Sequence, residues 1–198
     1  MTADSTQISH HIQVEHLWKV FGNNPMSALA PENAEKSRAE IQSEFNQVVA
    51  LKDVSFKVKK GETFVVMGLS GSGKSTLVRC LIRLIEATSG SILVEDEDVT
   101  LLNEKSLRDF RRTKISMVFQ NFGLLPHRNV MENACYGLEI KNISKDERHE
   151  KAQRMLDLVG LNGWENSRVS QLSGGMQQRV GLARALAVEP EILLMDEP

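Results

Sequence analysis

The sequence lacks the features that mark several common classes of protein. It holds two cysteines among 198 residues, and neither they nor the five scattered histidines show the spacing of a disulfide framework or a metal site. The net charge of −2 gives no broad basic face for nucleic acid. No apolar run reaches the ~18 residues of a membrane-spanning helix. A disulfide-rich secreted domain, a metal-centred protein and a membrane-spanning protein are therefore not expected.

The composition is that of an ordinary globular protein, with 41% hydrophobic and 25% charged residues. Its length suffices for one sizeable core and a small appended subdomain. Cys80 and Cys135 each stand in an apolar helical pattern, which favours buried free thiols in a reducing compartment. Residues 1–11 (MTADSTQISHH) are polar and lack the apolar core of a signal peptide, so we expect a disordered tail there.

Two stretches near the N-terminus alternate apolar and polar residues, as half-buried strands do. They are residues 12–21 (IQVEHLWKVF) and 48–59 (VVALKDVSFKVK), and we expect them to pair in an antiparallel β subdomain. The insertion 22–47 between them is polar, but Ile41 and Phe45 stand four residues apart among charged residues. This spacing predicts a short amphipathic helix within the insertion.

The rest of the chain alternates strands and helices, which is typical of a mainly parallel sheet covered on both faces. Strands are expected at residues 63–67, 91–94, 115–119 and 191–195, and helices at residues 75–87, 104–112 and from the LSGG stretch to about residue 187. Residues 120–171 change to loops and amphipathic helices, the latter at 130–137 and 144–159. This stretch predicts a helical subdomain inserted into an α/β core.

Residues 68–75 (GLSGSGKS) match the phosphate-loop pattern G-x4-G-K-[ST]. Glycines let such a loop wrap closely, so that its N–H groups point at phosphate oxygens, and the following helix adds its positive end. Lys74 can reach the β- and γ-phosphates, and the Ser75 hydroxyl can bind Mg²⁺. A chance glycine turn is the alternative, but a strand before the loop and a helix after it favour a nucleotide site. The residues predicted to bind nucleotide here are Gly68, Ser70, Gly71, Ser72, Gly73, Lys74, Ser75 and Thr76.

A second candidate site is the apolar strand that ends in ILLMDE, residues 192–197. In a phosphate-loop fold, Asp196 at the strand end holds Mg²⁺ directly or through water. Glu197 could orient and deprotonate the attacking water. Strands often end in acidic turn residues, so the pattern gains its meaning from the phosphate loop that precedes it.

Residues 172–179 read LSGGMQQR, in which three small residues precede a helix-forming run. Two interpretations are open at this point. The glycines can serve a turn whose backbone angles other residues resist. Alternatively, they leave a helix N-terminus bare, so that its N–H groups can meet an anion.

GLSGSGKST, VFQ, LSGGMQQR and ILLMDEP occur in this order, and together they resemble the nucleotide-binding subunit of ATP-binding-cassette (ABC) transporters over about residues 12–198. LSGG, between the glutamine and the acidic strand, narrows the resemblance from phosphate-loop NTPases in general to this family. The resemblance implies an α/β fold: a P-loop NTPase (RecA-like) core with an N-terminal antiparallel β subdomain and an inserted α-helical subdomain. It also implies an ATPase that closes as a homodimer around two ATP molecules, with Mg²⁺.

The resemblance assigns further roles. Ser173, Gly174 and Gly175 of one copy would face the γ-phosphate held by the phosphate loop of the other copy. Gln120 would touch Mg²⁺ and the attacking water, and Phe21 would stack on adenine. Without the family, Gln120 reads as a surface residue and Phe21 as a core residue. The predicted catalytic residues are Glu197, Gln120 and Lys74, and the predicted Mg²⁺ ligands are Ser75, Gln120 and Asp196.

Within the family, the insertion 22–47 and the stretches 67–90, 119–133 and 172–187 look most like the ATPase of glycine betaine/proline importers, the quaternary-amine uptake systems of bacteria. This implies osmoprotectant import, with an integral membrane permease at the groove 120–133 and an extracytoplasmic substrate-binding protein as partners. It implies a peripheral location on the cytoplasmic face of the inner membrane. An ATPase for another solute, such as methionine or polyamine, and a non-transport ABC protein stay open. A small-molecule kinase would leave LSGGMQQR unexplained.

Two features depart from the usual family pattern. Met176 takes the place of a glutamine, which leaves the serine and glycines of the signature intact. The family's aspartate-containing loop, its γ-phosphate histidine and its last strands follow the acidic strand, whereas His127 and His149 precede it. We therefore expect a piece of a longer protein, and we expect ATP hydrolysis to need the remainder.

Overall fold

The computed structural model describes residues 10–197. The chain forms two compact units, Met1–Asn103 and Glu104–Pro198. Of the tail predicted for residues 1–11, residues 1–9 lie outside the described residues, whereas His10 and His11 already belong to the first strand. That end of the tail prediction is wrong, because both residues pair with neighbouring strand segments. Among the described helices, none is both long and apolar enough to cross a membrane.

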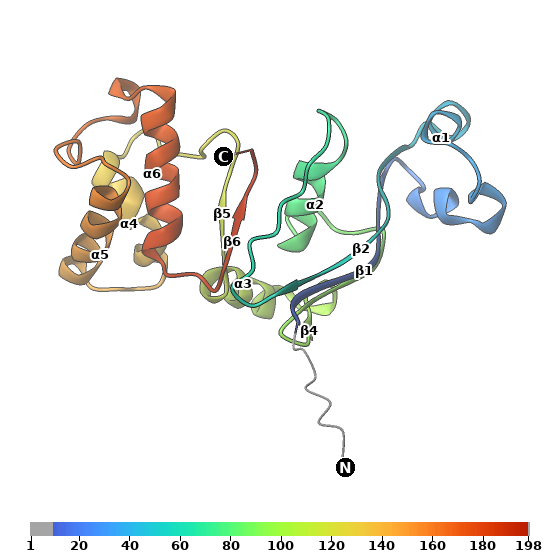
Figure 1. Cartoon of the computed structure of the whole chain (residues 1–198), viewed down its shortest axis with the longest axis horizontal. Coiled ribbons are helices and arrows are strands. Elements are labelled where there is room, and N and C mark those ends of the chain that lie inside the picture. Colours follow the sequence, from blue (N-terminus) through green and yellow to red (C-terminus); the bar gives the residue numbers. More distant parts are fainter. Residues whose placement is uncertain (1–9, 198) are drawn as a thin grey trace, which may run out of the picture. The chain divides into compact units, whose positions relative to one another are not determined.

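The first unit is built on a four-stranded antiparallel sheet in the order β2-β1-β3-β4 (Figure 1). Its strands are β1 (His10–Phe21), β2 (Val48–Lys59), β3 (Ser89–Val94) and β4 (Glu97–Asp98). The predicted pairing of the two alternating stretches is confirmed, with Val14 opposite Phe56 and Val20 opposite Val49. Alternation gives the sheet a buried face, on which Val14 and Ile92 are almost fully covered.

The insertion 22–47 folds into a small lobe on the β1–β2 pair. It contains the 3₁₀ helices η1 (Pro25–Leu29) and η2 (Pro31–Asn33) and the helix α1 (Arg38–Phe45). α1 begins at a capping box in which Ser37 Oγ accepts from Glu40 N–H and Glu40 accepts from Ser37 N–H. Ile41 is buried together with Val20 and Val49 of the strands. The predicted amphipathic helix is therefore confirmed, and its apolar residues anchor the lobe to the sheet.

Residues 63–67 form no strand, so that prediction is wrong. The chain between β2 and the next helix is irregular, and Val65 and Met67 are 67% and 86% exposed. Phe64 is 45% exposed, and its ring stacks on that of Phe56 with the centroids 4.9 Å apart. A strand needs a neighbour that satisfies its N–H and C=O groups. No described strand pairs with residues 63–67, so apolar character alone does not make them one.

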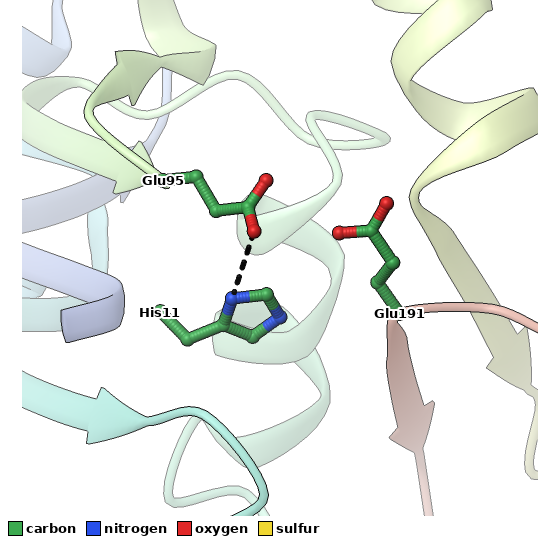
Figure 2. A group of neighbouring side chains, drawn as sticks. All are labelled: His11, Glu95 and Glu191. Atoms are coloured by element: carbon green, nitrogen blue, oxygen red, sulfur yellow. Dashed lines mark ion pairs between the residues drawn. The ribbon is translucent and has the colours of Figure 1, made fainter. Parts of the chain in front are cut away.

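The remaining elements of the first unit are α2 (Lys74–Leu81) and η3 (Val99–Leu101). α2 ends earlier than the predicted residue 87, because Arg83 takes a left-handed φ of 51°. Figure 2 shows His11 of β1 beside Glu95, which follows β3; Nδ1 and Oε1 are 3.5 Å apart. Glu191, also drawn there, belongs to the second unit, where its own ion-pair partner is Lys114 at 3.1 Å.

The second unit combines a two-stranded parallel sheet with helices. Its elements are α3 (Glu104–Thr113), β5 (Ile115–Val118), α4 (Val130–Ile140), α5 (Lys145–Leu158), η4 (Val169–Gln171), α6 (Gly174–Ala187) and β6 (Ile192–Met195). β5 and β6 run parallel in register, with Ile115 opposite Ile192 and Val118 opposite Met195. The predicted order of helices and strands from residue 104 onward is confirmed.

Helices α4, α5 and α6 lie side by side and enclose their own core (Figure 1). Val130, Leu156 and Val180 are fully buried in it, one from each helix. Cys135 lies in the same core, and burial raises the pKa of its thiol to about 11. Cys80 on α2 shows the same rise to about 11 for the same reason. Both cysteines are thus buried free thiols, as predicted.

Candidate nucleotide site

The phosphate loop lies in the first unit and ends where α2 begins. Gly71 and Gly73 have φ of 78° and 102°, a region that side chains other than glycine resist. A Cβ on Gly73 would lie 2.5 Å from the Ala50 carbonyl oxygen, and one on Gly68 would lie 2.7 Å from Ser72 Oγ. Backbone angle therefore requires glycine at positions 71 and 73, and space requires it at position 73 as well, where the loop packs against β2.

Lys74 is the first residue of α2, and its side chain turns back over the loop. Its Nζ donates to the carbonyl oxygens of Gly68 at 3.0 Å and Leu69 at 3.1 Å. Ser72 N–H donates to the same Leu69 oxygen, which closes the turn on itself. Ser70 is exposed in this turn, while Ser75 and Thr76 occupy the half-buried first turn of the helix. The eight predicted residues thus lie in this loop and in the first turn of α2.

Phe21 is the last residue of β1, and its ring is 41% exposed. It lies opposite Val48 of β2, two residues from the point where Gly73 packs on Ala50. Phe21 and the phosphate loop therefore adjoin the same stretch of β2. The ammonium group of Lys19 lies 4.8 Å from the ring centroid, a cation–π contact that covers part of the ring.

The acidic residues lie in the second unit, at the carboxyl ends of β5 and β6. Asp196 N–H donates to the Val118 carbonyl at 3.0 Å, and the Asp196 side chain is only 2% exposed. Gln120 Nε2 donates to Glu197 Oε2 at 2.5 Å. Glu197 itself is exposed and has a left-handed φ of 51°. Because parallel strands end at one edge, Gln120 meets Glu197 here although the two lie far apart in sequence, and Asp196 directly precedes Glu197.

The bare start of α6 is not explained by the backbone. Ser173 caps the helix, its Oγ accepting from Met176 N–H at 3.3 Å. Neither Gly174 nor Gly175 has a positive φ, and a Cβ on either would meet no described atom within 4 Å. All three residues are exposed. Of the two interpretations, a turn that requires glycine is therefore excluded at these positions. The other interpretation, an exposed helix N-terminus whose N–H groups can meet an anion, is consistent with this geometry.

One contact of helix α6, made near its C-terminal end, was missed from the sequence. Arg184 of α6 donates Nη1 to the Gly123 carbonyl and Nη2 to the Phe122 carbonyl, both at 2.7 Å. It thereby holds the loop that follows Gln120. The signal was a single cation inside the otherwise apolar run VGLARALA, where a charged side chain needs a dedicated partner.

A glycine-rich loop before a helix and a pair of carboxylates after a parallel strand are features of the phosphate-loop NTPase fold. Residues 51–198 match the family model described as ABC transporter. The chain is 53% identical over 186 residues to the glycine betaine/carnitine transport ATP-binding protein GbuA of Listeria monocytogenes, covering 94% of this chain and 47% of that protein. It is 50% identical over 197 residues to the glycine betaine transport ATP-binding protein OpuAA of Bacillus subtilis, covering 100% and 47%.

A solved structure agrees with these matches. The ATP-binding cassette MJ0796, described as a dimeric post-hydrolysis state bound to ADP and Pi, superposes with a TM-score of 0.78 at 33% identity, covering 93% of this chain and 73% of that one. The chain belongs to the ABC transporter family, and its fold is that of the P-loop NTPase cassette. It spans about half the length of the transport ATP-binding proteins that it matches.

Proposed function

We propose that the whole protein binds ATP with Mg²⁺ and hydrolyses it. The observation that carries this proposal is the hydrogen bond between Gln120 and Glu197 just after β5 and β6, next to the buried Asp196, in a chain that also holds the phosphate-loop sequence. Glu197 is exposed and hydrogen-bonded to an amide, so it can accept a proton from a water that Gln120 orients.

The donors present suit a small hard cation. Asp196 offers a buried carboxylate, Ser75 a hydroxyl at the start of α2 and Gln120 an amide oxygen, and oxygen ligands of this kind are those that Mg²⁺ prefers. When bound, Mg²⁺ would neutralise charge on the β- and γ-phosphate oxygens. Lys74 would exchange its contacts with Gly68 and Leu69 for phosphate oxygens, and Phe21 would stack on adenine.

We further propose that two copies share each ATP. Ser173, Gly174 and Gly175 present a hydroxyl, unobstructed N–H groups and a helix dipole at an exposed surface. No described residue of the same chain fills the space that the two glycines leave open. The N-terminus of α6 in one protomer would cover the γ-phosphate that the phosphate loop of its partner holds.

The transported solute in this proposal is a glycine betaine- or proline-type osmoprotectant. This choice of solute rests on the names of relatives that are about 50% identical over nearly the whole chain. The protein would then work on the cytoplasmic face of the bacterial plasma membrane. There it would drive a permease that receives solute from an extracytoplasmic binding protein.

Reconstitution tests this function directly. The whole protein is placed in proteoliposomes with the permease and binding protein encoded beside it, and uptake of radiolabelled glycine betaine is followed with and without internal ATP. ATP-dependent uptake is expected. Uptake of methionine or polyamine instead would assign another solute. An ATP hydrolysis rate that is the same with and without the permease would favour a non-transport role.

A further inference from the structure

Arg184 connects two parts of the candidate site that lie far apart in sequence. It belongs to α6, the helix that starts at the signature residue Ser173. Its neighbours Ala183 and Ala185 are buried, and partial burial lowers the pKa of its own guanidinium. A guanidinium group stays charged in such a place, and its N–H groups need hydrogen-bond acceptors. It finds them in the backbone of the loop after Gln120.

That loop has an unusual conformation at the two residues that Arg184 contacts. Phe122 and Gly123 both have a left-handed φ of 55°, which Phe122 would not adopt unless its surroundings held it. The two 2.7 Å hydrogen bonds from Arg184 supply that hold. The Phe122 carbonyl oxygen also lies 3.6 Å from the position a Cβ on Gly181 would occupy, so the loop lies directly on α6.

We propose that Arg184 is a positioning residue for Gln120, through which α6 sets the catalytic edge. The inference rests on the proposed function, in which Gln120 and Glu197 act on the attacking water. Two residues separate Gln120 from the carbonyl group of Gly123, and Gln120 Nε2 already contacts Glu197 Oε2. A shift of α6 that follows contact of Ser173 with a nucleotide therefore moves the backbone that carries Gln120.

The chain offers a matched control on the same helix. Arg179 Nη1 donates to two carbonyl groups, those of Val159 at 2.9 Å and Gly160 at 3.1 Å. These carbonyls lie just beyond α5 and not in the loop after Gln120. Arg179→Met thus removes a similar arginine–backbone contact from α6 without touching the glutamine loop.

The experiment measures ATPase turnover and ATP affinity of the full-length protein, reconstituted with its permease, for Arg184→Met, Arg184→Lys and Arg179→Met. We expect Arg184→Met to lower kcat about tenfold or more, since small misplacements of catalytic groups have effects of this size, and to leave the Kd for ATP within about twofold. Arg184→Lys keeps the charge but not the fork and should recover part of the loss. Arg179→Met should retain kcat.

A double-mutant cycle distinguishes positioning from general stability. In a Gln120→Ala background, Arg184→Met should lower kcat no further, because the residue it acts through is gone. An unchanged kcat in Arg184→Met, an equal further loss in the Gln120→Ala background, or an equal loss in Arg179→Met would overturn the proposal. Should Arg184→Met not fold, Arg184→Lys carries the same comparison. Failure of the proposed function gives a different result: the wild-type protein itself would not hydrolyse ATP.

Discussion

The two groups of predicted site residues, a binding half in the first unit and a catalytic half in the second, are held in different ways. In the first unit, the phosphate loop is shaped by its own glycines and closed by contacts between Lys74 and the loop carbonyls of Gly68 and Leu69. In the second unit, Gln120 and Glu197 come together after the paired strands β5 and β6, and Arg184 holds the loop that follows Gln120. The binding half is therefore local, and the catalytic half depends on tertiary structure.

This difference predicts that substitutions in the second unit lower kcat, whereas substitutions in the first unit weaken ATP binding. Glu197→Gln tests the catalytic half and should have the largest effect. Loss of a general base should lower kcat about 1,000-fold while the Kd for ATP is retained. An ATP-bound dimer should then accumulate, which gel filtration with ATP detects. Glu191→Gln, at the other end of β6, removes only a partly exposed ion pair with Lys114 and should retain turnover. Unchanged turnover in Glu197→Gln, or a species that stays monomeric with ATP, contradicts the proposed role.

Lys74→Ala tests the binding half and should give the opposite pattern. Removing the charge-assisted contacts that Lys74 is proposed to make with phosphate should weaken ATP binding about 100-fold in the full-length protein, measured by calorimetry. Lys60→Ala is the control, because Lys60 is an exposed lysine beyond β2. Normal affinity in Lys74→Ala would remove the phosphate-loop assignment, whatever the result for Glu197.

Phe21→Ala sharpens the comparison within the first unit. Loss of one base–aromatic stack should weaken ATP binding about tenfold and leave the binding of inorganic tripolyphosphate unchanged. Phe45 in the insertion lobe is a matched control, since Lys36 lies 4.9 Å from its ring much as Lys19 lies 4.8 Å from that of Phe21. Phe45→Ala should destabilise the lobe without altering ATP affinity. An equal loss for ATP and tripolyphosphate would show that Phe21 acts on the loop and not on the base.

The same local-versus-tertiary distinction explains what could be predicted from the sequence. The phosphate loop could be recognised from the sequence because glycines at fixed positions determine its conformation. Gly73 is an example, since a Cβ there would clash with the Ala50 carbonyl oxygen. The helix in the insertion was found because Ile41 and Phe45 carry its period. The strand at residues 63–67 was mispredicted because apolar composition indicates burial, whereas pairing requires a neighbour that composition does not name.

Contacts made by a single side chain were also beyond sequence reasoning. A solitary arginine in an apolar run indicates a partner but not which carbonyl groups accept from it, and Arg184 selects those of Phe122 and Gly123. The contact between Gln120 and Glu197, 77 positions apart in sequence, was not predicted; both residues were expected to act at the attacking water, Gln120 only through the family resemblance. Their meeting depends on the register of β5 against β6, which periodicity alone does not fix.

The two buried thiols, one in each unit, give the smallest effect. Each folded-state pKa is raised by burial to about 11, above the ~8.5 of an unfolded chain, so the stability from the neutral thiols is fully present below about pH 8.5 and lost as pH rises towards 11. Urea unfolding of wild type and of Cys80→Ala and Cys135→Ala should show a shallower alkaline decline in each variant. Identical slopes would contradict the burial.

The order in which the thiols react with a labelling reagent extends this test to the units themselves. Cys80 lies on the eight-residue helix α2, which begins at Lys74, not far beyond the unpaired stretch 63–67, whereas Cys135 lies within the core of α4, α5 and α6. Local opening is easier where fewer buried contacts must break. We therefore expect Cys80 to be labelled before Cys135 at pH 8, as followed by mass spectrometry of digested peptides. The reverse order would mean that α2, which follows the phosphate loop, opens less readily than the core of α4, α5 and α6.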